Sequence, residues 1–179
     1  MSFIDMDDDF MLTCHHEAGH AVAAVMRGHE LRALTVEATE EFRGFTGYRG
    51  RPVDDAFIGW AGPWAQGRAL WRGDAGGDSL TLDAVDEEGI EFRDYISAAF
   101  LTGGDGDLHA VDRYVDELSG LGLDLPSPEA TWCRELELVW PVILGVAARL
   151  LHGESITHQM VEEALEQHLA ARFAPEAGG

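Results

Sequence analysis

The sequence contains no lysine, and its only basic side chains are twelve arginines, set against 33 acidic residues. The resulting formal charge of −21 repels phosphate backbones, so the composition argues against nucleic-acid binding. Without lysine, the chain has no phosphate-binding lysine of a P-loop, no Schiff-base lysine and no lysine general base. The composition therefore excludes a nucleotide-driven machine of the P-loop kind.

Long apolar runs and cysteines are also scarce. The longest nearly unbroken apolar run, residues 139–148, is roughly half the length of a membrane span. The acidic N-terminus lacks the basic and apolar regions of a signal peptide, and two cysteines are too few for a disulfide scaffold. We therefore expect a cytoplasmic protein without membrane insertion. A chain of 179 residues is expected to form a single domain, 1–179, with flexible ends at 1–9 and 174–179.

Apolar periodicity, caps and breakers predict a mainly α (α+β) fold with one small β-hairpin. Helices are expected near residues 11–27, 54–72, 91–101, 105–118, 127–152 and 157–173. Pro63 should kink or split the second of these, and Pro141 should bend the fifth. Strands are expected at 31–38 and 44–48, and the glycine-rich acidic segment 73–88 is expected to be a loop. Trp60, Trp64 and Trp71 have helical spacing and are expected in the core.

One motif carries chemistry: His16-Glu17-Ala18-Gly19-His20, an H-E-x-x-H sequence inside the first predicted helix. Side chains four residues apart share a helix face, so both imidazoles can bind one metal ion. Zinc accepts imidazole nitrogens and tolerates an open fourth position for water. A carboxylate at Glu17 can take a proton from that water as general base. The neighbouring His15 is interpreted as a surface or supporting residue, His29 as solvated, and Cys14 as a small buried hydrophobe.

A catalytic zinc needs a third protein ligand. The metzincin continuation is excluded because Ala23 and Met26 occupy the positions where it requires glycine and histidine. A site embedded in membrane helices is excluded by the absence of spans. The main candidates cluster in residues 103–109, at the start of a predicted helix, and are Asp105, Asp107 and His109. Asp78, Glu91 and the C-terminal glutamates are weaker candidates, because they lie in a predicted loop or on predicted solvated helix faces.

Several segments together resemble the peptidase domain of the FtsH family of ATP-dependent zinc proteases. The first is the motif with its continuation, residues 16–24. The others follow in the same order: the hairpin region 34–48, the stretch 61–66 (AGPWAQ), the turn 102–110 (TGGDGDLHA) and the segment 154–157 (ESIT). Only the metal motif is highly specific. Gln66 stands where the family has an acid, and neither an ATPase module nor a membrane anchor is found in the sequence.

The resemblance implies a zincin-like helical domain and a zinc-dependent endopeptidase. Carried over by position, His16, His20 and Asp107 would bind Zn²⁺, and Glu17 would be the catalytic base. The substrate would be an unfolded or flexible polypeptide. Because the family's peptidase domains form rings fed by an ATPase, the resemblance also raises a homo-oligomer and an ATPase partner acting in trans. The sequence leaves two other hypotheses open: a non-hydrolytic zinc-binding interaction or regulatory protein on a peptidase scaffold, and a metal-free helical bundle.

Overall fold

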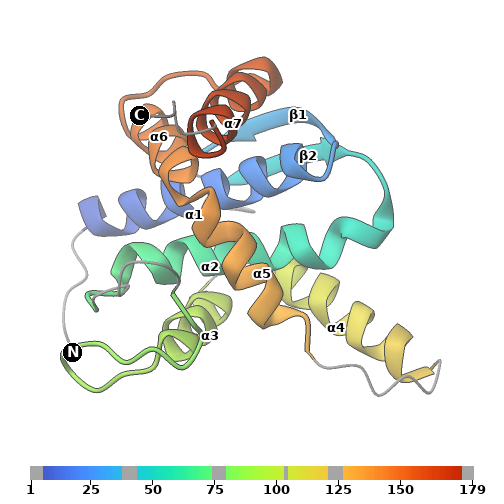
Figure 1. Ribbon diagram of the computed structural model, residues 1–179, viewed down its shortest axis with the longest axis vertical. Coiled ribbons are helices and arrows are strands. Elements are labelled where there is room, and N and C mark those ends of the chain that lie inside the picture. Colours follow the sequence, from blue (N-terminus) through green and yellow to red (C-terminus); the bar gives the residue numbers. More distant parts are fainter. Residues whose placement is uncertain (1–5, 38–43, 74–79, 103–104, 121–126, 175–179) are drawn as a thin grey trace.

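The computed structural model describes residues 6–37, 44–73, 80–102, 105–120 and 127–174 (Figure 1). Its helices are α1 (Met6–Met26), α2 (Asp55–Leu70), α3 (Phe92–Thr102), α4 (Asp105–Gly120), α5 (Glu129–Leu138), α6 (Trp140–Leu151) and α7 (His158–Arg172). A short 3-10 helix, Pro52–Asp54, precedes α2. Strands β1 (Glu30–Thr35) and β2 (Phe45–Arg49) pair antiparallel in a two-stranded sheet. The predicted mainly α fold with a small hairpin is confirmed.

Helix α1 ends where the sequence predicts, at a glycine. Gly28 has a positive φ of 73°, a conformation that only glycine adopts without strain. The Gly28 amide donates to the Val25 carbonyl and the His29 amide donates to the Ala24 carbonyl, the paired bonds of a Schellman motif. This turn directs the chain into β1 and places the hairpin beside α1.

Two central helices, α1 and α2, run side by side through the molecule (Figure 1). α6, α7 and the hairpin cover α1, whereas α3 and α4 pack on α2. The contact between α1 and α2 is close: a Cβ atom added to Gly19 would lie 2.4 Å from the Ala61 carbonyl oxygen. Trp60, Trp64 and Trp71 are all buried, which confirms the prediction that they belong to the core.

The two prolines act differently from each other. Pro63 lies inside α2, which continues as one helix from Asp55 to Leu70, so the predicted split does not occur. The predicted single helix around Pro141 is instead two helices, α5 and α6, which meet at Val139. Pro141 occupies the first turn of α6, where the absent N–H costs no intrahelical bond. Of the predicted 73–88 loop, residues 74–79 lie outside the described residues.

The prediction of a solvated His29 is wrong, and so is the surface alternative for His15. His29 is 1 % exposed rather than solvated, and its Nε2 lies 3.0 Å from a carboxylate oxygen of Asp54. His15 is also buried, against the ring of Trp140, and its Nδ1 donates to the Met11 carbonyl. Cys14 is fully buried, as expected.

The predictions about the chain ends and about membranes are tested only in part. Of the segments predicted to be flexible, 1–5 and 175–179 lie outside the described residues, and residues 6–9 belong to α1. None of the helices within the described ranges is long and apolar enough to cross a membrane.

Candidate metal centre

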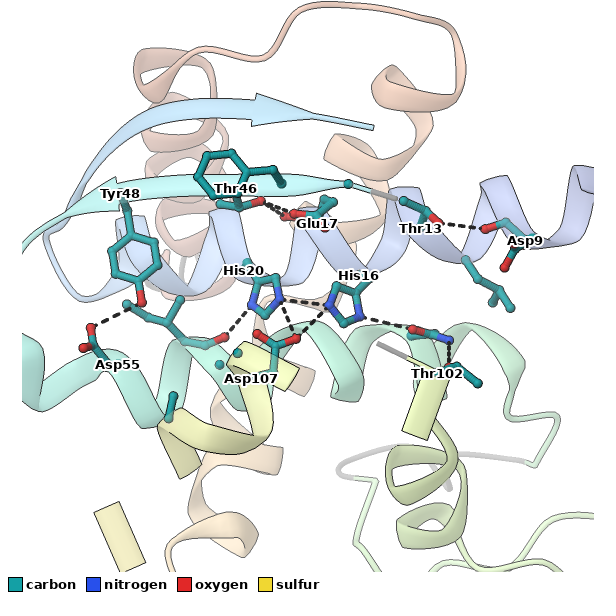
Figure 2. A pocket seen from close by; sticks show the side chains of 18 residues that line it. Asp9, Thr13, His16, Glu17, His20, Thr46, Tyr48, Asp55, Thr102 and Asp107 are labelled. Carbon is teal, nitrogen blue, oxygen red and sulfur yellow. Dashed lines mark hydrogen bonds and ion pairs between the residues drawn. The ribbon is translucent and has the colours of Figure 1, made fainter. Parts of the chain in front are cut away.

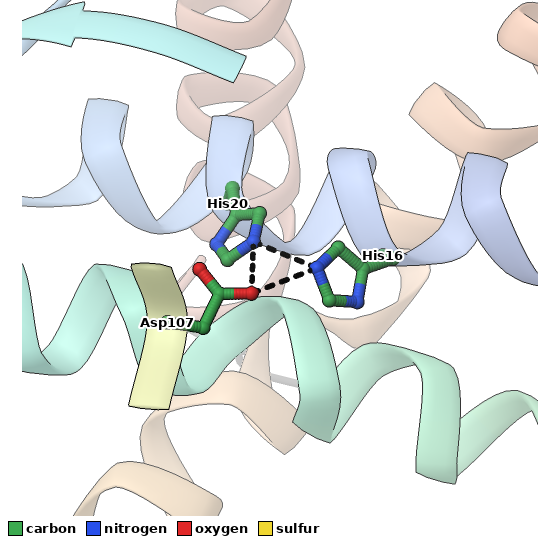
Figure 3. Close-up of side chains that lie close together, drawn as sticks. All are labelled: His16, His20 and Asp107. Atoms are coloured by element: carbon green, nitrogen blue, oxygen red, sulfur yellow. Dashed lines mark hydrogen bonds and ion pairs between the residues drawn. The ribbon is translucent and has the colours of Figure 1, made fainter. Parts of the chain in front are cut away.

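Three side chains from two helices converge on one point (Figure 3). His16 and His20 project from the same face of α1, and Asp107 comes from the first turn of α4. His16 Nε2 lies 3.0 Å from His20 Nε2 and 3.0 Å from Asp107 Oδ2. His20 Nε2 lies 3.3 Å from the same Asp107 oxygen. The fold therefore brings His16 and Asp107 together, although they are 91 positions apart in the chain.

The far side of each imidazole ring shows which nitrogen carries the proton. His20 Nδ1 donates to the backbone carbonyl of Ile58 at 2.7 Å. His16 Nδ1 lies 3.1 Å from Oε1 of Gln66 and donates to it. In a neutral imidazole one nitrogen is a donor and the other an acceptor. In the neutral form of each ring, Nε2 is therefore the nitrogen with the lone pair, and it points toward the carboxylate oxygen of Asp107.

This donor set fits a metal ion. Three electron-rich atoms that face one another repel unless a cation or a proton lies between them. A tetrahedral zinc site with bonds of about 2.0–2.1 Å has ligand atoms roughly 3.3 Å apart, and the three separations here are 3.0, 3.0 and 3.3 Å. Two imidazoles and one carboxylate leave a fourth position for water. His16, His20 and Asp107 could therefore hold a divalent metal ion.

Helix α2 organises this cluster without supplying one of the three candidate metal ligands. Ile58, Gly62 and Gln66 follow one another at four-residue intervals, so they form one stripe along α2. Ile58 and Gln66 accept the two Nδ1 protons, and Gly62 lies between them. A Cβ atom at Gly62 would lie 2.3 Å from His20 Nε2 and 2.9 Å from His16 Nε2. Glycine at this position therefore leaves room for the imidazoles.

The same helix sets the position of α4. A Cβ atom at Gly59 would lie 3.2 Å from the backbone oxygen of Asp107 and 3.1 Å from Cβ of Ala110. The absence of a side chain at Gly59 thus lets α4 approach closely enough for Asp107 to reach the histidines of α1.

Glu17 is 5 % exposed and is held by the hairpin rather than by α2. The Thr46 hydroxyl of β2 donates to Glu17 Oε2 at 2.6 Å. Gly44 passes so close that a Cβ atom there would lie 2.7 Å from Glu17 Oε1. The carboxylate is therefore fixed on the β2 side of the cluster, as Figure 2 shows.

The charges of the cluster shift its pKa values in a consistent way. Burial alone would lower the pKa of His20, but the Asp107 carboxylate beside it raises the pKa to about 9. Burial alone would raise the pKa of Asp107, yet His20 and His16 lower it well below its usual range. Both shifts show that the cluster attracts positive charge, which a proton or a metal ion can supply.

A cavity of about 560 Å³ opens onto the cluster (Figure 2). His16, Glu17, His20 and Asp107 all line it, so the structure brings together the residues singled out by the sequence. β2 forms one wall, and the other walls come from α1, α2, α4 and the end of α3. Among the residues that the structure describes, no arginine lines this cavity.

Of the two other main candidates from the sequence, the structure tests only His109. His109 is exposed on α4 and is absent from the group of side chains that could share an ion. The side chain of Asp105 lies outside what the structure describes. Sequence reasoning also missed the role of α2: it noted Gln66 as a departure from a family pattern, but no sequence signal connected it to His16.

Comparison with known proteins gives one match. Residues 9–70 match the model of the Peptidase M50B-like family, a family of metallopeptidases. The matched segment is about a third of the chain and contains His16, Glu17, His20 and α2, while Asp107 lies beyond it. No curated protein and no solved structure matches the chain. The matched family is not FtsH, so that narrower resemblance stays a prediction. The segment from α1 to the end of α2 is thus similar to a metallopeptidase family.

Proposed function

We propose that the protein is a zinc-dependent peptidase whose metal ligands are His16, His20 and Asp107. The observation that carries the proposal is the convergence of two imidazole Nε2 atoms and a carboxylate oxygen at separations of 3.0–3.3 Å. Two nitrogens and one oxygen form the ligand set of many hydrolytic zinc sites. The match of residues 9–70 to a metallopeptidase family supports the same conclusion independently.

A bound zinc ion would supply Lewis acidity toward the peptide carbonyl and would lower the pKa of a water molecule. The chain itself supplies the proton transfer. Glu17 is adjacent in sequence to a ligand and lines the same cavity, so its carboxylate can accept the proton of the attacking water. It then returns the proton to the nitrogen of the leaving amine as the C–N bond breaks. The Thr46 hydroxyl holds Oε2, which leaves Oε1 as the atom that handles the proton.

The hairpin provides a place for the substrate backbone. β2 pairs with β1 along one edge, and the two-stranded sheet places no further strand on its other edge within the described ranges. Figure 2 shows β2 between β1 and the metal cluster, so this second edge faces the site. An extended polypeptide could add to it as a strand, with its backbone N–H and C=O groups paired. This favours an unfolded or flexible polypeptide as substrate.

The narrower resemblance to the FtsH peptidase domain receives support from the position of Asp107 at the start of α4 and from the hairpin after the motif helix. A homo-oligomer and an ATPase partner acting in trans are part of that proposal. Size-exclusion chromatography with light scattering tests the first, and capture with the purified protein followed by an ATPase assay tests the second.

The test of the proposed function pairs metal content with cleavage. The purified protein should contain one zinc per chain and cleave an unstructured polypeptide. Cleavage should stop when the zinc is chelated. Glu17→Gln should keep the zinc and slow cleavage by about 10²–10⁴-fold, the contribution of a general base. Glu162→Gln, at an exposed site on α7, is the matched control and should change neither the zinc content nor the cleavage rate.

Two outcomes would contradict the proposal. Stoichiometric zinc without cleavage of any of several unfolded substrates would indicate a non-hydrolytic zinc-binding protein on a peptidase scaffold. Absence of stoichiometric zinc after incubation with the metal would leave a helical bundle without a metal centre.

A further inference from the structure

A directional chain of hydrogen bonds leads from helix α3 through α2 to the metal cluster (Figure 2). Gln66 Oε1 lies 3.1 Å from His16 Nδ1, and Gln66 Nε2 donates to the hydroxyl of Thr102 at 3.3 Å. The Thr102 hydroxyl in turn donates to the Ala99 carbonyl at 3.1 Å. The backbone of α3 therefore anchors this chain at its far end.

Each link sets the direction of the next. Because the Thr102 hydroxyl gives its only proton to a carbonyl, its oxygen accepts from the NH₂ group of Gln66. The amide oxygen of Gln66 then faces His16, where it can only accept. His16 therefore carries a proton on Nδ1, which makes Nε2 the nitrogen that can bind a metal ion.

The two histidines differ in the kind of group that accepts the Nδ1 proton. The Nδ1 proton of His20 is taken by a backbone carbonyl, that of Ile58, which no substitution of a side chain removes. The Nδ1 proton of His16 is taken by a side chain, and that side chain is a neutral amide. The basicity of His16 therefore depends on which side chain stands at position 66, whereas that of His20 does not.

The geometry points to Gln66 as a positioning residue for the metal centre: its amide fixes the tautomer and ring orientation of His16, and its neutrality keeps the donor strength of His16 moderate. This inference rests on the proposed metal centre. Partners of this kind on zinc-bound histidines raise ligand basicity when they are carboxylates, and their loss typically costs 10–100-fold in metal affinity. Gln66 therefore provides orientation without the added basicity of an acid.

The test measures zinc affinity by competition with a chromophoric chelator. Gln66→Leu removes the acceptor and should weaken binding by about 10–100-fold. Gln66→Glu restores the acceptor with a negative charge, so its affinity should equal or exceed that of the wild type. Thr102→Val removes only the second link and should cause a smaller loss than Gln66→Leu. Gln159→Leu, at an exposed site on α7, is the matched control and should leave affinity unchanged.

Two further measurements separate positioning from folding. Thermal unfolding of each variant without metal reports whether the fold survives. The visible absorption spectrum of bound Co²⁺ reports ligand geometry; it should change in Gln66→Leu and be restored in Gln66→Glu. If Gln66→Leu does not fold, Gln66→Glu and Thr102→Val still give the two affinity comparisons.

The outcomes distinguish this inference from the proposed function. If the wild type binds no zinc, the metal centre itself is refuted. If the wild type binds zinc and Gln66→Leu binds it equally well, only the role of Gln66 is refuted. Equal losses in Gln66→Leu and Gln66→Glu would also overturn it, because a purely structural amide would tolerate neither change.

Discussion

Adding one methyl group at Gly62 should strongly weaken metal binding without unfolding the protein. A Cβ atom there would lie 2.3 Å from His20 Nε2, whereas ordinary contact begins at 3.4 Å, so the ring would have to move by about 1.1 Å. Metal–ligand distances tolerate changes of only about 0.2 Å. Moving the ring also strains its 2.7 Å bond to the Ile58 carbonyl. We therefore expect Gly62→Ala to weaken zinc binding by at least about 100-fold, beyond the upper range for loss of a supporting contact.

The effect of Gly62→Ala on stability should be small by comparison. Overpacking a buried site costs about 1–3 kcal/mol, and replacing a helical glycine by alanine returns up to about 1 kcal/mol. The net decrease in the free energy of unfolding, measured by denaturant titration without metal, should be about 0–3 kcal/mol. Zinc affinity is measured on the same samples.

Gly145→Ala is the matched control. Gly145 lies in α6, and a Cβ atom there would meet nothing within 4 Å. This variant should gain about 0.5–1 kcal/mol of stability and keep its zinc affinity. If Gly62→Ala bound zinc as tightly as Gly145→Ala, the argument that Gly62 makes room for the ligands would be refuted.

Three other substitutions test separate parts of the structure. Thr46→Val removes the hydroxyl that holds Glu17, so we expect slower cleavage by the zinc-loaded protein with unchanged zinc content; equal rates would contradict the proposed role. Thr157→Ala removes an N-cap that accepts a backbone hydrogen bond in the first turn of α7, and thermal unfolding should show a loss of about 1 kcal/mol. Burial raises the pKa of Asp54, but the hydrogen bonds and charges of His29 and Arg51 together outweigh this and leave the pKa lowered. A lowered carboxyl pKa stabilises the fold above about pH 4 and less so as pH falls further. The stability difference between wild type and Asp54→Asn, measured in denaturant, should therefore shrink below about pH 4, and a difference that grew there would refute the assignment.

Local sequence signals predicted most of the fold because they act over short distances. The glycine that ends α1 and the threonine that caps α7 are features of single turns, and the structure shows both where the sequence placed them. Pro141 shows the limit of such signals. Proline is compatible both with a bend inside a helix and with the first turn of a new helix, and Pro141 lies in the first turn of α6.

The remaining differences arise from contacts between distant segments. His29 was expected in solvent because it follows a helix-ending glycine, but Asp54 meets it from the segment before α2. His15 is buried because α6 brings Trp140 against it. The Gln66–His16 bond likewise requires α2 to lie beside α1, across 50 residues of sequence. No local pattern carries that information.

Local signals predict the positions of the two histidines, whereas the position of Asp107 depends on a contact between distant segments. The helical spacing of His16 and His20 places their side chains on one face of α1 without reference to the rest of the chain. Asp107, in contrast, could be preferred over its neighbours only through a family resemblance, because its approach depends on Gly59 allowing α4 close to α2.

The most direct test of the account is a crystal structure of the zinc-loaded protein with anomalous diffraction recorded at the zinc absorption edge. The account predicts one anomalous peak per chain, bonded to Nε2 of His16, Nε2 of His20 and a carboxylate oxygen of Asp107 at about 2.0–2.2 Å. A peak at any other group of side chains, or no peak between these three, would contradict it.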